Sequence, residues 1–386
     1  MEKCWCLAVL LLCIISTVAA LSVGGGVGID VGIGNAGGGG GGGGGVWIGG
    51  GINSPLPSDS GSSVPSLTRA YTALQAWKSA IKEDPLRILD TWVGSDVCSY
   101  KGVFCAEPQD EMDASPGRLV AGTLPDTFRY LYSLQELDLS NNLFSGPFPV
   151  VTLYIPNLIY LDLRFNEFSG SIPDDLFNKK LDAIFLNNNQ FEGQLPQNLA
   201  NSPASVINLA NNKFSGSIPI SFGFMGSNLK EILFLNNQLT GCIPEGVGLF
   251  TEMQVLDVSS NSLMGHLPDT MSCMENMEVL NLAHNELSGV VPDPVCSLKS
   301  LVNLTVAYNF FSGFSQQCNK LFFRNVGFDF SANCVPGKNM QRPQPECSLI
   351  PGGGLNCLRI PLVCGSIGVM AAAETRPNSS SSSSSP

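Results

Sequence analysis

A motif that returns at an almost constant interval constrains this chain more than any other feature. In the pattern L-x-L-x-x-N-x-L-x-G-x-x-P, the asparagine falls at Asn142, Asn166, Asn189, Asn212, Asn237, Asn261, Asn285 and Asn309. The successive intervals are 24, 23, 23, 25, 24, 24 and 24 residues. Such regular spacing predicts one coil of chain per repeat, with each coil stacked on the next.

The residues within one unit predict how each coil is built. Leu137 and Leu139 should point into the coil and Asp138 outward, because side chains alternate along a strand. The asparagine stands at a turn, where its amide can bond buried backbone groups that would otherwise cost about 1–3 kcal/mol each. Period and pattern are those of leucine-rich repeats. We therefore expect an α/β leucine-rich repeat solenoid: a curved right-handed superhelix with short parallel strands on the concave side and loops and 3-10 turns on the convex side.

The flanking segments complete the predicted domain organisation. Residues 1–20 combine a charged start, an apolar run and small residues, which predicts a signal peptide; the run is too short for a membrane anchor. Residues 21–66 are rich in glycine, serine and proline, and we expect an unstructured linker, with attachment to wall polymers as the alternative.

Residues 67–118 should form an N-terminal cap, since apolar residues have helical spacing from Tyr71 to Ile81. Repeats should occupy 119–313, a closing cap and cysteine-rich hinge 314–368, and an unstructured serine-rich tail 369–386.

Ten of the thirteen cysteines remain once the signal peptide is removed, an even number that suggests disulfides in an oxidising compartment. Two bridges are expected at the ends of the solenoid, Cys98 with Cys105 and Cys318 with Cys334. Cys273 and Cys296 hold nearly the same place in adjacent coils and could also pair, although Cys242 competes. Glycosylation acceptors occur at Asn303, facing outward on the sheet, and at Asn378 in the tail.

No catalytic residue, metal site or cofactor site can be assigned. His266 and His284 lack partners at metal-ligand spacing. The adjacent Asp174 and Asp175 lie where no cleft is expected, whereas glycosidase chemistry needs two carboxylates across a cleft. No nucleophile motif stands beside a credible base. We therefore expect a protein that is not an enzyme.

The outward positions of the predicted sheet carry the strongest functional signal. They are Glu136, Asp138, Tyr160, Asp162, Arg164, Phe185, Asn208, Glu231, Leu233 and Asp257. Acids mixed with aromatic and aliphatic side chains suit a basic, partly apolar peptide. The formal net charge of -12 argues against nucleic acid as a partner, and no segment reads as a convincing membrane span.

Several longer motifs are similar to those of a known plant family. They are Leu74-Gln-Ala-Trp-Lys-Ser-Ala-Ile81 and Cys98-Ser-Tyr-Lys-Gly-Val-Phe-Cys105 in the cap, Leu161-Asp-Leu-Arg-Phe-Asn-Glu-Phe168 and Tyr308-Asn-Phe-Phe311 in the repeats, and Asn333-Cys-Val-Pro-Gly337 near the end. On these residues the chain resembles the plant leucine-rich repeat extensins over roughly residues 67–368. The proline-rich extensin tail usual in that family is not present in this sequence.

The resemblance implies a secreted protein of the plant cell wall that acts in wall organisation or growth signalling. The implied partner is a secreted, basic, cysteine-rich peptide, or else a wall protein or polysaccharide. Two other functions stay open at this point: an inhibitor of wall-degrading enzymes similar to the polygalacturonase inhibitors, and a structural wall glycoprotein. The glycine-rich head and cysteine-rich hinge count against the inhibitor.

Overall fold

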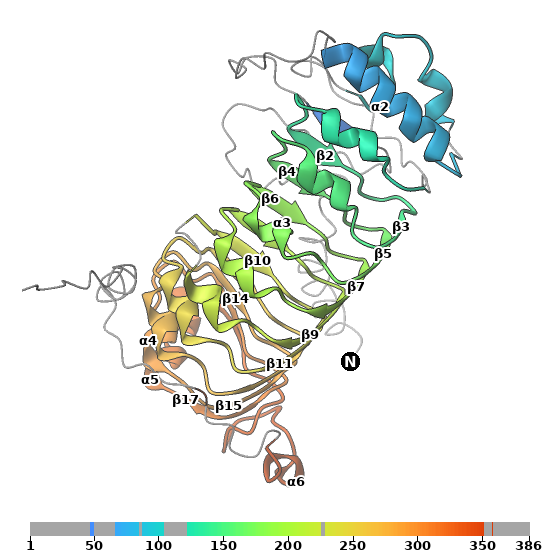
Figure 1. Cartoon of the computed structure of the whole chain (residues 1–386). Coiled ribbons are helices and arrows are strands. Elements are labelled where there is room, and N and C mark those ends of the chain that lie inside the picture. The colour runs from blue at the N-terminus through green and yellow to red at the C-terminus, as the bar shows by residue number, and fades with distance from the viewer. Residues whose placement is uncertain are drawn as a thin grey trace, which may run out of the picture. The chain divides into compact units, whose positions relative to one another are not determined.

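The computed structural model describes residues 47–49, 66–84, 87–103, 122–224, 228–350 and Cys357 (Figure 1). The chain forms two compact units. The first unit runs to Gly170 and also includes Ala183–Gln190. The second unit contains Ser171–Asp182 and everything from Phe191 onward.

An aromatic core holds the N-terminal cap of the first unit together. The cap consists of helix α2 (Ser66–Ala80) and the 3-10 turns η1 (Ile88–Thr91) and η2 (Val97–Ser99). The ring of buried Trp77 lies 5.7 Å from Trp92 and 5.0 Å from Phe128, centroid to centroid, and Trp92 stacks on Tyr100 at 5.5 Å. These rings cover the first coil, whose apolar interior would otherwise meet water. The helix predicted for this segment is confirmed.

Short parallel strands follow in two sheets of the first unit. The first sheet contains β2 (Glu136–Asp138), β4 (Tyr160–Asp162) and β6 (Ala183–Phe185). The second sheet contains β3 (Ser145–Gly146) and β5 (Glu167–Gly170). The 3-10 turns η3 (Asp126–Tyr130) and η4 (Val150–Tyr154) precede β2 and β4.

Three residues of the glycine-rich segment also form a strand. β1 (Trp47–Gly49) pairs antiparallel with β2, with Ile48 opposite Leu137. The prediction of an unstructured segment is wrong at these residues; the remainder of 21–65 lies outside the described residues. The strand lies where Trp47 and Ile48 interrupt the glycines, and its ladder joins backbone groups to the edge of the sheet.

The second unit repeats the same arrangement over more coils. Its first sheet contains β8 (Val206–Asn208), β10 (Glu231–Leu233), β12 (Val255–Asp257), β14 (Val279–Asn281), β16 (Asn303–Thr305) and β18 (Gly327–Asp329). Its second sheet contains most of β7 (Gln190–Gln194), then β9 (Lys213–Ser217), β11 (Gln238–Gly241), β13 (Ser262–Gly265), β15 (Glu286–Val291) and β17 (Phe310–Phe314). The strands of both sheets are parallel, which confirms the predicted α/β leucine-rich repeat solenoid.

Short helices and 3-10 turns connect the strands of the second unit. They are α3 (Asp175–Asn178), η5 (Gln197–Asn201), η6 (Ile220–Phe224), η7 (Glu245–Leu249), η8 (Asp269–Cys273), α4 (Asp293–Cys296), α5 (Gln316–Asn319), η9 (Phe322–Arg324) and α6 (Gln344–Cys347). Within the described parts of the chain, no helix combines the length and apolarity that a membrane crossing requires.

The repeated asparagine joins each coil to the one before it. The Nδ2 of Asn166 donates to the carbonyls of Leu163 and Arg164 in its own turn and to Leu139 in the preceding coil. Its Oδ1 accepts the backbone N–H of Phe144, also in the preceding coil. The residue before the asparagine has φ between 51° and 58° in every coil from Asn141 to Ala332. The predicted role of these asparagines is therefore confirmed.

One further coil follows the predicted end of the repeats at residue 313. β18 pairs in parallel with β16, and Asn333 donates to the Val306 carbonyl while accepting the N–H of Phe311. The predicted boundary is wrong by one coil. Phe328 and Phe330 replace the two leucines, so the leucine pattern stops although the interval from Asn309 is again 24 residues.

The disulfides of the second unit differ from the predicted pairs. Bridges join Cys242 to Cys357, Cys296 to Cys318, and Cys334 to Cys347. The predicted pairs Cys318–Cys334 and Cys273–Cys296 are wrong. Stacking places residues about one repeat apart side by side, and Cys296 and Cys318 are separated by 22 positions. Cys98 and Cys273 are also disulfide-bonded. Cys105, the predicted partner of Cys98, lies outside the described residues, so that pairing stays a prediction.

Candidate functional site

The structure separates the ten predicted ligand-facing residues into two sets on the first sheet. Glu136, Asp138, Tyr160, Asp162, Arg164 and Phe185 belong to the first unit, and Asn208, Glu231, Leu233 and Asp257 to the second. In the first set, direct side-chain contacts join Tyr160, Asp162, Arg164 and Phe185, and Asp138 acts on Asp162 and Arg164 through its charge. Strand register produces this cluster, because Asp138, Asp162 and Phe185 stand opposite one another on β2, β4 and β6.

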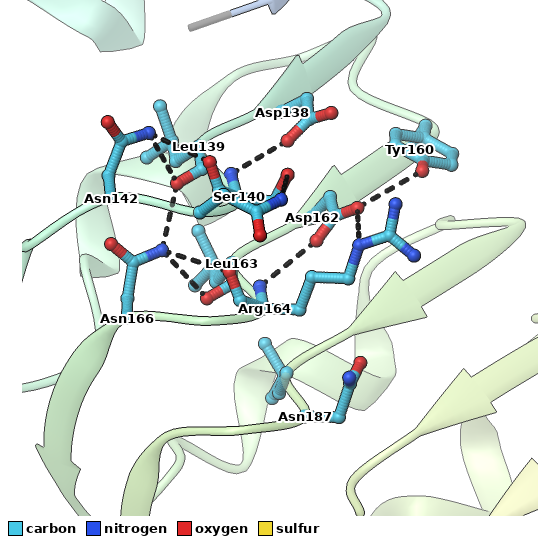
Figure 2. Close-up of polar contacts among 12 residues, drawn as sticks. Asp138, Leu139, Ser140, Asn142, Tyr160, Asp162, Leu163, Arg164, Asn166 and Asn187 are labelled. Atoms are coloured by element: carbon cyan, nitrogen blue, oxygen red, sulfur yellow. Dashed lines mark hydrogen bonds and ion pairs between the residues drawn. The ribbon is translucent and has the colours of Figure 1, made fainter. Parts of the chain in front are cut away.

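A buried carboxylate lies at the centre of this cluster (Figure 2). The side chain of Asp162 is fully buried, and its Oδ2 lies 2.9 Å from the Nε of Arg164. The hydroxyl of Tyr160 donates to the same oxygen at 3.3 Å, while Oδ1 accepts the Arg164 backbone N–H at 3.0 Å. Every polar atom of this carboxylate is therefore already bonded within the protein.

Two side chains flank the exposed ring of the cluster. The Arg164 guanidinium carbon lies 5.4 Å from the centroid of the Phe185 ring, and the ring of Tyr160 lies 5.6 Å from it. Phe185 is partly exposed, as is the Arg164 side chain at 20%. A cation over a ring face and a tilted aromatic pair both stabilise such an arrangement. The phenyl ring is therefore held in place without being covered.

Carboxylates outnumber cations in this cluster, and burial makes their charge costly. Burial, followed by the charge of Asp138, raises the pKa of Asp162 to about 8; the ion pair with Arg164 opposes this shift without cancelling it. Burial also raises the pKa of Asp138, and that of Glu136 at the start of β2. Asp138 and Asp162 thus share one arginine, so a further cation placed beside Asp138 would favour the ionised forms.

Several residues predicted as exposed ligand contacts are buried instead. Asp162 is 0% exposed, Asp257 4% and Asn208 6%. Asp257 accepts hydrogen bonds from the backbone N–H and hydroxyl of Ser259 and from the Nδ2 of Asn281. Sequence alternation shows which way a side chain points, but its burial depends on what packs beside it in neighbouring coils.

The same strand position has a structural role that the sequence analysis missed. At Asp138, Asp162, Asn208, Asp257, Asn281 and Asp329 the side-chain Oδ1 accepts the backbone N–H two residues later, at 2.7–3.2 Å. Aspartate and asparagine commonly close turns in this way. The recurrence of D or N after the first inward-facing apolar residue in most of the repeats was the available signal. The acidity of this face therefore arises partly from turn formation.

Asn187 is a member of this face that the sequence analysis did not identify. It follows β6 at the position that Arg164 occupies in the preceding coil, and its side chain is 1% exposed. Its Oδ1 accepts no hydrogen bond from any residue that the structure describes. An unsatisfied buried carbonyl costs about 1–3 kcal/mol, so Asn187 is a buried polar group of this face that still has bonding capacity.

The remaining predicted sites divide between described and undescribed parts of the chain. Asn303 lies on β16 opposite Gly327, and its Oδ1 accepts the Thr305 hydroxyl at 2.9 Å. The amide lies over Gly327, where a Cβ would meet its Nδ2 at 3.1 Å; glycosylation there stays a prediction. Asn378 lies outside the described residues. Among the residues that the structure covers, no group of three or more His, Cys, Asp or Glu side chains could hold a metal ion.

Comparison with known families identifies the repeat and its cap. Residues 69–106 match the family described as leucine rich repeat N-terminal domain. Residues 251–311, and separately 133–152, 157–178 and 205–225, match families described as leucine rich repeat. These matches include the strands that carry most of the candidate cluster.

Relatives of known name share this part of the chain. Leucine-rich repeat extensin-like protein 7 of Arabidopsis thaliana is 52% identical over 225 residues, covering 50% of this chain and 52% of that protein. Leucine-rich repeat extensin-like protein 2 of the same plant is 46% identical over 324 residues, covering 76% of this chain and 41% of that protein. The chain therefore spans about half the length of these relatives or less.

Solved structures with the same fold include plant receptor ectodomains. The Arabidopsis receptor kinase HAESA, in complex with the peptide hormone IDA and the co-receptor SERK1, matches with a TM-score of 0.60 and 27% identity, covering 69% of this chain and 46% of that one. The plant peptide hormone receptor RGFR1 in complex with RGF2 matches with a TM-score of 0.53 and 30% identity, covering 55% of this chain and 34% of that one.

Proposed function

This chain is a leucine-rich repeat protein homologous to the plant leucine-rich repeat extensin-like proteins, and from that premise we propose that it is a secreted cell-wall protein that binds a basic, cysteine-rich peptide. The proposed contact surface, here called the acidic-aromatic cluster, comprises Glu136, Asp138, Tyr160, Arg164 and Phe185 of the first unit. Buried Asp162 supports this surface from beneath.

The unequal charge of the acidic-aromatic cluster is the observation that carries the proposal. Asp138 and Asp162 share a single arginine, so a lysine or arginine of a ligand placed beside Asp138 would favour the ionised carboxylates. Phe185 offers a fixed apolar face beside this charge. Charge should then mainly set orientation and association rate, while the aromatic contacts retain the bound peptide.

The solved neighbours support the choice of ligand class. The structures of HAESA and RGFR1 each contain a bound peptide hormone, and both are related to this chain at more than 25% identity. The acidity of the chain, with a net charge of -12, favours a basic peptide over an acidic one.

Titration calorimetry with basic, disulfide-bonded peptides tests the proposal. Asp138→Asn keeps the side-chain oxygen that accepts the Ser140 N–H but removes the charge. Phe185→Ala removes the ring and should cost about 2 kcal/mol, roughly 30-fold in affinity, whereas Asp138→Asn should mainly slow association. Asp329→Asn is the matched control, since Asp329 makes the same turn contact on β18 of the second unit, outside the acidic-aromatic cluster.

Two outcomes would contradict this site. If no basic peptide binds, the proposed activity is wrong. If a peptide binds but Phe185→Ala and Asp138→Asn behave like Asp329→Asn, the peptide site lies elsewhere. A peptide whose lysines and arginines are replaced by glutamate serves as the ligand control.

A further inference from the structure

A basic pocket lies between the connecting helices near the end of the second unit. It has a volume of about 330 Å³ and is lined by Cys296, Ser297, Lys299, Gln317, Lys320 and Arg324. These residues come from α4, α5 and η9 and the turns beside them, and α4 and α5 are the orange helices of Figure 1. Three of the six are cations and none is an acid, in a chain whose net charge is -12.

Hydrogen bonds and a disulfide hold the walls of this pocket in place. The Arg324 guanidinium donates to the carbonyls of Cys296, Leu298 and Lys299, which mark the end of α4. The Cys296–Cys318 bridge ties α4 to α5. The charge of Arg324 is therefore fixed at the pocket, with donor capacity left over because a guanidinium has five N–H groups.

One acid lies close to the pocket without lining it. Asp293 accepts the Gln317 backbone N–H at 3.0 Å. Its pKa is lowered, first by the Ser315 hydroxyl and the Gln317 N–H and then by the charge of Lys320. With Asp293 counted as ionised against Lys299, Lys320 and Arg324, two positive charges remain in excess. The pocket therefore retains a net attraction for anions.

An exposed aromatic ring follows Lys320 by one turn. Phe323 is 91% exposed, and its backbone N–H donates to the Lys320 carbonyl at 3.0 Å, so the two side chains leave the same face of this 3-10 turn. The ring of Phe322 lies instead 5.8 Å from that of Phe328 on β18, centroid to centroid. A small inorganic anion would make no use of the Phe323 ring, whereas the apolar face of a sugar ring can lie on it.

We propose that this pocket binds the carboxylate groups of an acidic polysaccharide. Carboxylates repeated along the polymer would contact Lys299, Lys320 and Arg324, and a sugar ring would lie against Phe323. This activity goes beyond the proposed peptide binding, because it uses connecting helices of the second unit instead of the first sheet. Attraction between exposed charges weakens with salt, so binding should fall as ionic strength rises.

The test measures binding of the full secreted chain to a de-esterified polyuronate oligosaccharide, its methyl-esterified form, and inorganic phosphate. We expect binding to the first probe only. The double variant Lys299→Glu/Lys320→Glu should reduce affinity by about tenfold or more, because attraction becomes repulsion. Phe323→Ala should reduce it by a smaller factor. Both lysines are exposed, so the fold should persist, as circular dichroism can verify.

The matched control is the double variant Lys180→Glu/Lys230→Glu. It changes the net charge equally at two exposed lysines outside the pocket, and it should leave affinity close to that of the unaltered chain. If both double variants lose affinity for polyuronate equally, the attraction is a non-specific effect of net charge, and the pocket is not the binding site. Failure to bind polyuronate, or equal binding of the esterified form or of phosphate, would overturn the ligand class. Peptide binding is measured on the same variants, so that failure of the polysaccharide site can be distinguished from failure of the proposed peptide site.

Discussion

At the scale of single residues, this chain uses carboxylates and amides mainly as backbone partners. The aspartate or asparagine after the first leucine accepts an N–H two residues on, and the later asparagine joins adjacent coils. Charges that look like ligand contacts in the sequence are therefore partly structural. The proposed ligand site differs from the other turns in its charge, because two carboxyl groups, those of Asp138 and Asp162, lie beside one guanidinium, that of Arg164.

Replacing a coil-joining asparagine should be costly. Asn166→Ala removes three donated bonds and one accepted bond, all to backbone groups, and three of the four bonds are buried. We expect a loss of about 3 kcal/mol or more in the free energy of unfolding, measured by urea titration. Asn157→Ala, which removes one exposed bond to the Tyr132 carbonyl, should cost less than about 1 kcal/mol. Similar losses in both variants would contradict the role of the asparagine.

The buried carboxylate should make stability depend on pH. The pKa of Asp162 in the folded chain is about 8, above the ordinary value for aspartate of about 4. Between these values the folded state holds a proton that the unfolded state has released, so stability falls as pH rises through this window. Asp162→Asn resembles the protonated form and should become progressively more stable than the unaltered chain over the same range. The measurement is the unfolding midpoint at several pH values for the unaltered chain, for Asp162→Asn and for the control Asp329→Asn. Parallel pH profiles for these three proteins would refute the prediction.

At the scale of elements, each coil is joined to its neighbour in two ways. Backbone ladders pair the strands, and in the last coils disulfides join the connecting helices or the closing segment. The Cys296–Cys318 bridge fixes α4 to α5 at the basic pocket. The packing of α4 against α5 and the geometry of the pocket therefore both depend on this disulfide.

The three described bridges should differ in their contribution to stability. They close loops of 115, 22 and 13 residues for Cys242–Cys357, Cys296–Cys318 and Cys334–Cys347. Paired Cys→Ala variants should cost about 5, about 3.4 and about 3 kcal/mol in that order, if restriction of the unfolded chain dominates. Unfolding titrations under non-reducing conditions measure the ranking. A reversed order would indicate that local packing outweighs loop closure.

At the scale of the whole molecule, a solenoid must protect the two ends of its stack. Aromatic rings of the cap and the strand β1 do so in the first unit. β1 pairs with the free side of β2, where an uncovered edge would offer backbone groups to another chain. The three residues Trp47–Gly49 thus give the glycine-rich segment a definite structural role.

Deleting Trp47–Gly49 should promote self-association. Loss of β1 would leave the β2 edge unpaired, so we expect scattering to rise with protein concentration relative to the unaltered chain. Deletion of Gly40–Gly42 shortens the same segment equally without removing the strand and serves as the control. If the two deletions scatter light alike, β1 does not protect the sheet.

Periodicity alone predicted most of the architecture of this chain. The 24-residue interval and the leucine pattern correctly predicted the fold, the strands of the first sheet and the role of the asparagines, because each depends on residues within one coil or in the next. The strands of the second sheet were not predicted. The last coil was missed because Phe328 and Phe330 stand where leucines were expected.

The tertiary structure decided the features that depend on contacts between distant residues. Cys242 pairs with Cys357, 115 positions away, which no local pattern indicates. The burial of Asp162 follows from Tyr160 and Arg164 lying against its carboxylate, although all three are outward positions in the sequence. The basic pocket exists only because Arg324 reaches back to the end of α4. The sequence determined which side of a coil each residue occupies, whereas packing between coils decided whether it is exposed, paired or free to bind.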